Sequence, residues 1–240
     1  MDAKQRAGAA PAPSRRPEQS PTPQPRAGLV VTGLIALGLV PILANTLRRV
    51  ALSLGSVDGS ADDGSHTLSL AVAVHIITAT IFVILGAFQF SPDFRRRNPG
   101  WHRMAGRVLV MVGMLVALSG LWLNQFVSFP AGSGELLYVF RWLAGLGMAL
   151  CIIIGFAAVR RRDIPRHREW MIRAYALGLG AGTQVFTLGF GEAIFGETAL
   201  NVALLNGAGW MINLAVAEWA IRRPRPGDQA SRDITKARVP

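Results

Sequence analysis

The stretch RRRNPGWHRMAGR, residues 95–107, places five arginines and a histidine between two long apolar segments. The stretch RRRDIPRHREWMIR, residues 160–173, begins 65 residues later and repeats the order, so that both read RRR-x4-HR. This alignment pairs Arg95 with Arg160 and His102 with His167. Arginine is costly to place in hydrocarbon. Each stretch therefore predicts a turn that stays on one side of a membrane and joins two spanning helices.

The composition also indicates a membrane protein. Hydrophobic residues make up 51% of the chain and charged residues only 16%, against about 25% charged in an average soluble domain. A formal charge of +11 would suggest nucleic-acid binding in a soluble domain. Here the basic residues stand at the ends of apolar segments, so we expect a lipid partner and no nucleic acid. The single cysteine, Cys151, excludes an intrachain disulfide and a multi-cysteine metal site.

Six apolar segments are each long enough to cross a hydrocarbon core, which takes about 20 helical residues. They lie near residues 28–48, 67–90, 104–127, 136–159, 171–191 and 200–221. We predict an all-α transmembrane bundle of six spans, with a four-helix core formed by the second to fifth spans. The proline-rich residues 1–27 are expected to be a disordered tail, residues 28–221 the bundle, and residues 222–240 a basic tail.

The distribution of basic residues predicts the orientation. With six spans, all of the 25 lysines and arginines except Arg48, Arg49 and Arg141 fall on one side. The positive-inside rule assigns that side to the cytoplasm. We therefore expect a membrane protein with both termini in the cytoplasm.

Two motifs resemble a family of bacterial membrane proteins catalogued as Domain of Unknown Function 2306. They are HIITATIFVILGAFQFSPDFRRRNPGWHRMAGRV, residues 75–108, and HREWMIRAYAL, residues 167–177. The resemblance covers roughly residues 67–190, and it implies a protein of the bacterial inner membrane. The positions that carry it are His75, Gly86, Gln89, Phe90, His102, Arg103, Gly106 and Arg107, then His167, Arg168, Trp170, Met171, Arg173 and Tyr175.

The chain departs from the family pattern at Gln184, because members often carry an arginine near that position. Any role of that arginine is therefore not carried over to this chain. The family has no established activity, so the resemblance implies an identity and no mechanism.

Polar residues inside the spans are candidate functional groups, because each costs free energy to insert. At about 100° per residue, one face of the second span gathers a set that should point into the bundle. It consists of His75, Ala79, Phe82, Gly86 and Gln89. Arg173 and Gln184 share a stripe of the fifth span, and the depths of His75, Gln184 and Asn206 would let these three meet. This pattern predicts either a polar pocket or proton path, or interhelical hydrogen bonds that only hold the bundle together.

At the basic turns, His102 and His167 could bind one anion together with their neighbouring arginines. The arginines in question are Arg103, Arg107, Arg168 and Arg173. A lipid phosphate is the natural candidate, since basic pockets between helices bind such headgroups. The alternative is that these charges only orient the hairpins. The matched stretches fit a parallel internal repeat, or two arginine-rich turns that are merely alike.

Three functional hypotheses follow. The first is a non-enzymatic membrane protein whose basic cytoplasmic face binds anionic lipid or a partner, since hydrolase and nucleotide-binding motifs are absent. The second is a redox protein with His75 as a haem b or quinone ligand, although His66, His102 and His167 are poorly placed as its axial partner. The third is a small-solute transporter or proton conductor. Glu218 is expected to pair with Arg222, four residues further on.

Overall fold

The computed structural model describes residues 25–53, 70–126 and 134–223, and within these ranges the only regular secondary structure is helix. The helices are α1 (Pro25–Ser53), α2 (Leu70–Gln89), α3 (Pro92–Arg97), α4 (Pro99–Phe126), α5 (Glu135–Arg160), α6 (Ile164–Gly178), α7 (Gly180–Phe195) and α8 (Ala199–Arg222). The tails predicted at 1–27 and 222–240 lie outside these ranges, apart from the residues that start α1 and end α8. His66 also lies outside them. The predicted all-α transmembrane bundle is confirmed.

Four helices, α2, α4, α5 and α8, are long and apolar enough to cross a membrane. They match the second, third, fourth and sixth predicted spans. In α1 the apolar stretch is shorter, Gly28–Ala44. The predicted fifth span, 171–191, is not one helix, because the chain breaks at Leu179 between α6 and α7. The count of six spans stays a prediction.

The break between α6 and α7 has a local cause in the sequence GLGAG, residues 178–182. Glycine costs about 1 kcal/mol relative to alanine in a helix interior, and three glycines here flank Leu179 within five residues. Leu179 ends one helix and starts the next. A hydropathy pattern averaged over a whole span does not register such a break.

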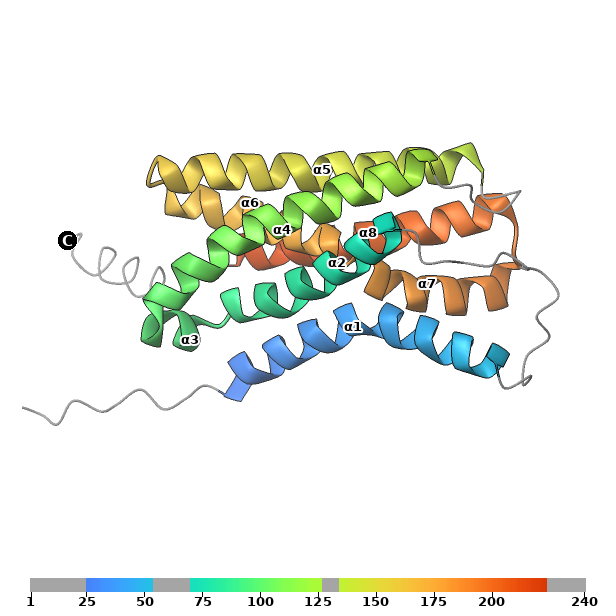
Figure 1. Cartoon of the computed structure of the whole chain (residues 1–240), viewed down its shortest axis with the longest axis horizontal. Helices are drawn as coiled ribbons and strands as arrows, with labels where there is room; N and C mark the ends of the chain where they lie inside the picture. Colours follow the sequence, from blue (N-terminus) through green and yellow to red (C-terminus); the bar gives the residue numbers. More distant parts are fainter. Residues whose placement is uncertain (1–24, 54–69, 127–133, 224–240) are drawn as a thin grey trace, which may run out of the picture.

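The core lies between α2, α4, α5 and α6, as the sequence predicted (Figure 1). Phe82 of α2 stands at its centre, with its ring 5.7 Å from that of Tyr175 on α6. The Tyr175 hydroxyl donates a buried hydrogen bond of 2.8 Å to the carbonyl oxygen of Val83 on α2. This bond ties the second hairpin to the first. In contrast to α6, the helix α7 packs mainly against α8 and α1.

The two hairpins follow one plan. Helices α4 and α6 begin at Pro99 and Ile164, so their starts are separated by the same 65 residues as the two RRR-x4-HR stretches. In both hairpins the chain runs toward the basic turn and then back (Figure 1). The first hairpin differs by the separate short helix α3, which Ser91 caps by accepting a hydrogen bond from the backbone N–H of Phe94. The structure thus extends the repeat from residues to helix boundaries.

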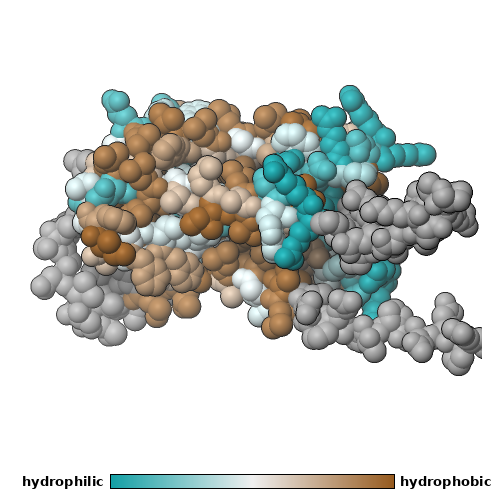
Figure 2. All heavy atoms as spheres, turned by 180° about the vertical axis from the view of Figure 1, so that it is seen from behind, coloured by the Kyte–Doolittle hydropathy of each residue, from teal (hydrophilic) through white to brown (hydrophobic). Residues whose placement is uncertain are grey.

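We use the name basic end for the end of the bundle that carries residues 95–97 and 160–162. The start of α1, helix α3, the α5–α6 turn and the end of α8 all lie there (Figure 1). Hydrophilic residues gather at this end, and an apolar band covers the middle of the bundle (Figure 2). Three acidic residues, Glu135, Glu192 and Glu197, lie near the opposite end. This arrangement is consistent with the charge segregation predicted from the sequence.

Helix α7 approaches α1 closely at Gly182. A Cβ atom at this position would collide with the backbone carbonyl oxygen of Leu37. A backbone atom cannot move aside as the end of a flexible side chain can. At Gly189, on the same helix, a Cβ would meet nothing within 4 Å. The two glycines therefore form a matched pair for testing the α1–α7 contact.

We predict that Gly182→Ala lowers the free energy of unfolding by about 1–3 kcal/mol, the usual cost of overpacking. Gly189→Ala should be neutral or slightly stabilising, because alanine favours helix. Unfolding in mixed micelles, followed by circular dichroism, measures both. Equal stability of the two variants would show that α1 does not approach α7 at Gly182.

Candidate functional site

The two basic turns lead into helices that start in the same way. α4 begins at Pro99 and α6 has Pro165 in its first turn, a place where proline is pre-organised for helix. Because α4 starts at residue 99 and α6 at residue 164, His102 and His167 are each the fourth residue of their helix. Their backbone N–H groups donate to Asn98 and Asp163, each over 3.0 Å. The repeated sequence therefore places two histidines at equivalent positions of two helix N-termini.

His102 and His167 both lie at the basic end of the bundle, at the starts of α4 and α6. The His102 ring lies within electrostatic range of Arg95, Arg103 and His167. His167 Nδ1 is 2.8 Å from the carbonyl oxygen of Gly155 on α5. His102 Nδ1 is buried and has no hydrogen-bond partner among the described residues. The site thus holds one histidine fixed to the backbone and one with an unused nitrogen.

The remaining candidates of the first hairpin lie nearby along the chain. Gln89 is the last residue of α2, and its Nε2 is buried without a partner within the part of the chain that the structure describes. Arg103 and Arg107 are exposed on the first two turns of α4. The structure therefore places these three candidates toward the basic end, together with the two histidines.

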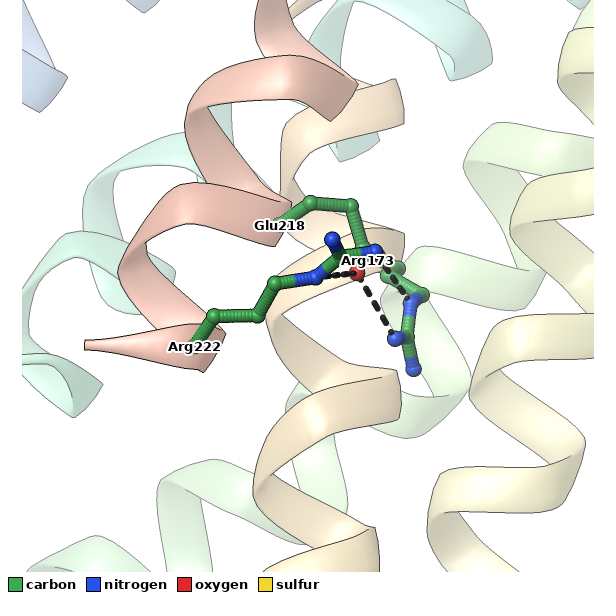
Figure 3. Close-up of polar contacts among 3 residues, drawn as sticks. All are labelled: Arg173, Glu218 and Arg222. Atoms are coloured by element: carbon green, nitrogen blue, oxygen red, sulfur yellow. Dashed lines mark hydrogen bonds and ion pairs between the residues drawn. The ribbon is translucent and has the colours of Figure 1, made fainter. Parts of the chain in front are cut away.

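Arg173 forms an ion pair between two helices. Its Nε donates to Glu218 Oε1 over 2.6 Å, so it joins α6 to α8 (Figure 3). The expected partner of Glu218, Arg222, lies further away, at 3.8 Å from the other carboxylate oxygen. Arg168 also reaches α8, where it donates to the carbonyl oxygen of Ala220 over 3.4 Å. The two α6 arginines therefore hold α6 against the end of α8, and Glu218–Arg222 is the secondary pair.

A polar seam closes the break between α6 and α7. Asn213 Nδ2 donates to the carbonyl oxygen of Ala176 over 3.1 Å. In a continuous helix that carbonyl would accept from Gly180, but the break removes this bond. The hydroxyl of Thr183 donates to Asn213 Oδ1 over 2.7 Å. Asn213 therefore connects both sides of the break to α8, a role that only the glycine-rich stretch and a polar face of α8 could have suggested from sequence.

The three intramembrane residues that were expected to meet are only partly brought together. Gln184 Nε2 donates to the carbonyl oxygen of Asn206 over 3.0 Å, in a buried contact between α7 and α8. His75 instead makes a 2.9 Å hydrogen bond to Ser119 Oγ on α4. A pocket shared by His75, Gln184 and Asn206 is therefore not supported by these contacts. Among the described residues there is no group of three metal-ligating side chains.

Comparison with known proteins gives one match. A family model described as Predicted membrane protein (DUF2306) matches residues 72–221, more than half of the chain, from α2 through α8. No curated protein and no solved structure matches the chain. The resemblance seen in the two motifs is confirmed, and the match extends past residue 190 to include α8.

We predict that Asn213→Leu destabilises the protein by about 1–3 kcal/mol, the cost of leaving buried polar groups unpaired. Both the Ala176 carbonyl and the Thr183 hydroxyl lose their partner on α8. Ile212→Ala is the control, because Ile212 directly precedes Asn213 on α8 and its side chain is 47% exposed. Thermal unfolding in detergent measures the difference, and an unchanged melting temperature for Asn213→Leu would mean that the seam contributes nothing.

Proposed function

The chain belongs to the family of predicted membrane proteins catalogued as Domain of Unknown Function 2306, and from that premise we propose that it binds anionic lipid. In this proposal it is a non-enzymatic protein whose basic end faces the cytoplasm. The ligand group is a lipid phosphate, held between the N-termini of α4 and α6. We call this place the two-histidine site. It consists of His102 and His167 with Arg103 and Arg168, the arginines next to them in the chain.

The observation that carries the proposal is the pairing of two equivalent helix starts. The N-terminus of a helix carries a partial positive charge that favours an anion. At α6 the Asp163 carboxylate already accepts a hydrogen bond from the backbone N–H of Arg166, so the start of α4 is the more open of the two. His102 and His167 stand in the first turns of α4 and α6 and interact electrostatically. The buried Nδ1 of His102 is a polar atom without a partner among the described residues, and an anion oxygen would satisfy it when that nitrogen carries its proton.

The surrounding charge favours a phosphate over a neutral headgroup. Three arginines of the basic turn that joins α2 to α4 are exposed at the end of α3. They are Arg95, Arg96 and Arg97. Of these, Arg96 pairs with Asp93, which leaves a net positive surface. Near an anionic membrane each such residue contributes about 1 kcal/mol of attraction. The positive surface draws anionic lipid to this end, and the histidines supply a fixed point of contact.

The depth of the site fits a headgroup. Residue 102 lies two positions before the third apolar segment, which begins near residue 104. Two residues of helix correspond to about 3 Å. The imidazole therefore lies next to the apolar band, at the level where lipid phosphates meet the hydrocarbon. A histidine at this depth can reach a phosphate without leaving the interface.

The test compares the loss of both histidines with the loss of one arginine charge at the same end of the protein. In native mass spectrometry, the wild-type protein should retain phosphatidylglycerol in preference to phosphatidylcholine. The double variant His102→Ala, His167→Ala should reduce that preference by about tenfold or more, as expected for lost hydrogen bonds to a charged group. The control is Arg97→Gln, which removes a full charge from the same surface.

If the positive surface alone attracts lipid, Arg97→Gln will reduce the preference at least as much as the double histidine variant. That result, or equal retention of both lipids by the wild-type protein, would contradict the two-histidine site. Circular dichroism and gel filtration confirm that the variants compared are folded.

A further inference from the structure

We propose a second lipid site, in which a groove between α5 and α8 holds one acyl chain of an anionic phospholipid. The headgroup of this lipid lies at Arg222 and Arg223, at the end of α8. The site is separate from the two-histidine site, because it is built on α8 and uses neither histidine.

The groove is an apolar hollow of about 410 Å³. Phe140 and Leu143 of α5 line one side, and Leu204, Gly207 and Met211 of α8 line the other. Gly207 lets the Phe140 ring lie close, since a Cβ there would come within 2.8 Å of that ring. Leu143, Leu204 and Met211 are 63%, 49% and 65% exposed, so the groove opens toward the membrane. A surface of this kind within the apolar band is covered by hydrocarbon.

The groove continues along the same face of α8 toward the basic end. Leu204, Met211, Ala215, Glu218 and Arg222 follow one another at spacings of three, four or seven residues, so they share a helix face. A second hollow of about 450 Å³ lies at the far end of this face, lined by Ala215, Glu218, Trp219, Arg222 and Arg223. In this proposal the two hollows are the apolar and the polar part of one strip along this face of α8.

The near end of the groove lies within reach of one acyl chain. Leu214, the last α8 residue of the groove, precedes Arg222 by eight residues, or about 12 Å of helix. Half of the hydrocarbon core is about 15 Å thick. The groove thus begins in the same half of the membrane as the arginines and continues past the centre. An extended acyl chain whose phosphate lies at Arg222 would run directly into it.

The charge at the polar end selects an anionic headgroup. The one carboxylate in the second hollow, Glu218, is already paired with Arg173 and Arg222. Arg223 stacks over the Trp219 ring, with its guanidinium carbon 3.6 Å from the ring centroid. Trp219 is 56% exposed, as expected of an indole at a membrane interface. Charge complementarity therefore favours an anionic phospholipid over a phospholipid without net charge in this strip.

The experiment uses the full-length protein in nanodiscs with a phosphatidylglycerol that carries a photoreactive diazirine on its acyl chain. Adducts are mapped by mass spectrometry. Met111 on α4 and Met211 on α8 form a matched pair, because they are 71% and 65% exposed. We expect Met211 to be labelled at least fivefold more than Met111. A chain-matched phosphatidylcholine probe should label Met211 less than the phosphatidylglycerol probe.

Two variants separate this proposal from the two-histidine site. Arg222→Gln with Arg223→Gln should reduce labelling at Met211 by phosphatidylglycerol to the level seen with phosphatidylcholine. The double variant His102→Ala, His167→Ala should leave labelling at Met211 unchanged. Equal labelling of Met111 and Met211, or equal labelling by the two lipids, would overturn the α8 site.

Discussion

The free-energy cost of placing arginine in hydrocarbon is the constraint on which this structure depends. It keeps both RRR-x4-HR stretches at one end of the bundle, so each must be the turn of a helical hairpin. Once the turns are fixed, the helices that follow them start at equivalent residues, Pro99 and Ile164. The placement of His102 and His167 at the same end of the bundle is a consequence of this arrangement. The candidate site therefore arises from the same residues that set the topology.

The sequence was sufficient for the features that depend on hydropathy and charge. The apolar segments predicted α2, α4, α5 and α8, and the repeated stretch predicted that His102 and His167 occupy corresponding places. It was insufficient where the outcome depends on how one helix is rotated against another. Arg173 and Glu218 are 45 residues apart, and only packing of α6 on α8 makes them partners. For the same reason His75 pairs with Ser119 on the adjacent α4 and not with Gln184.

The break between α6 and α7 shows how local and tertiary forces combine. Glycines 178, 180 and 182 weaken the helix, and the freed carbonyl of Ala176 needs a donor that lipid cannot supply. Asn213 of α8 provides it. Toward the basic end, α6 and α8 are joined a second time, by the ion pair between Arg173 and Glu218. Helix α6 is therefore fixed to α8 along its length.

The account can be tested most directly by asking on which side of the membrane the turns lie. Gly100 has open space around it, and Glu135 is exposed at the opposite end, so a cysteine at either position is accessible to a reagent. The native Cys151 is buried. A membrane-impermeant maleimide should label Gly100→Cys only in inverted inner-membrane vesicles and Glu135→Cys only in right-side-out vesicles. Labelling of Gly100→Cys from the outside, or of both positions from one side, would contradict the sorting of this chain by its arginines.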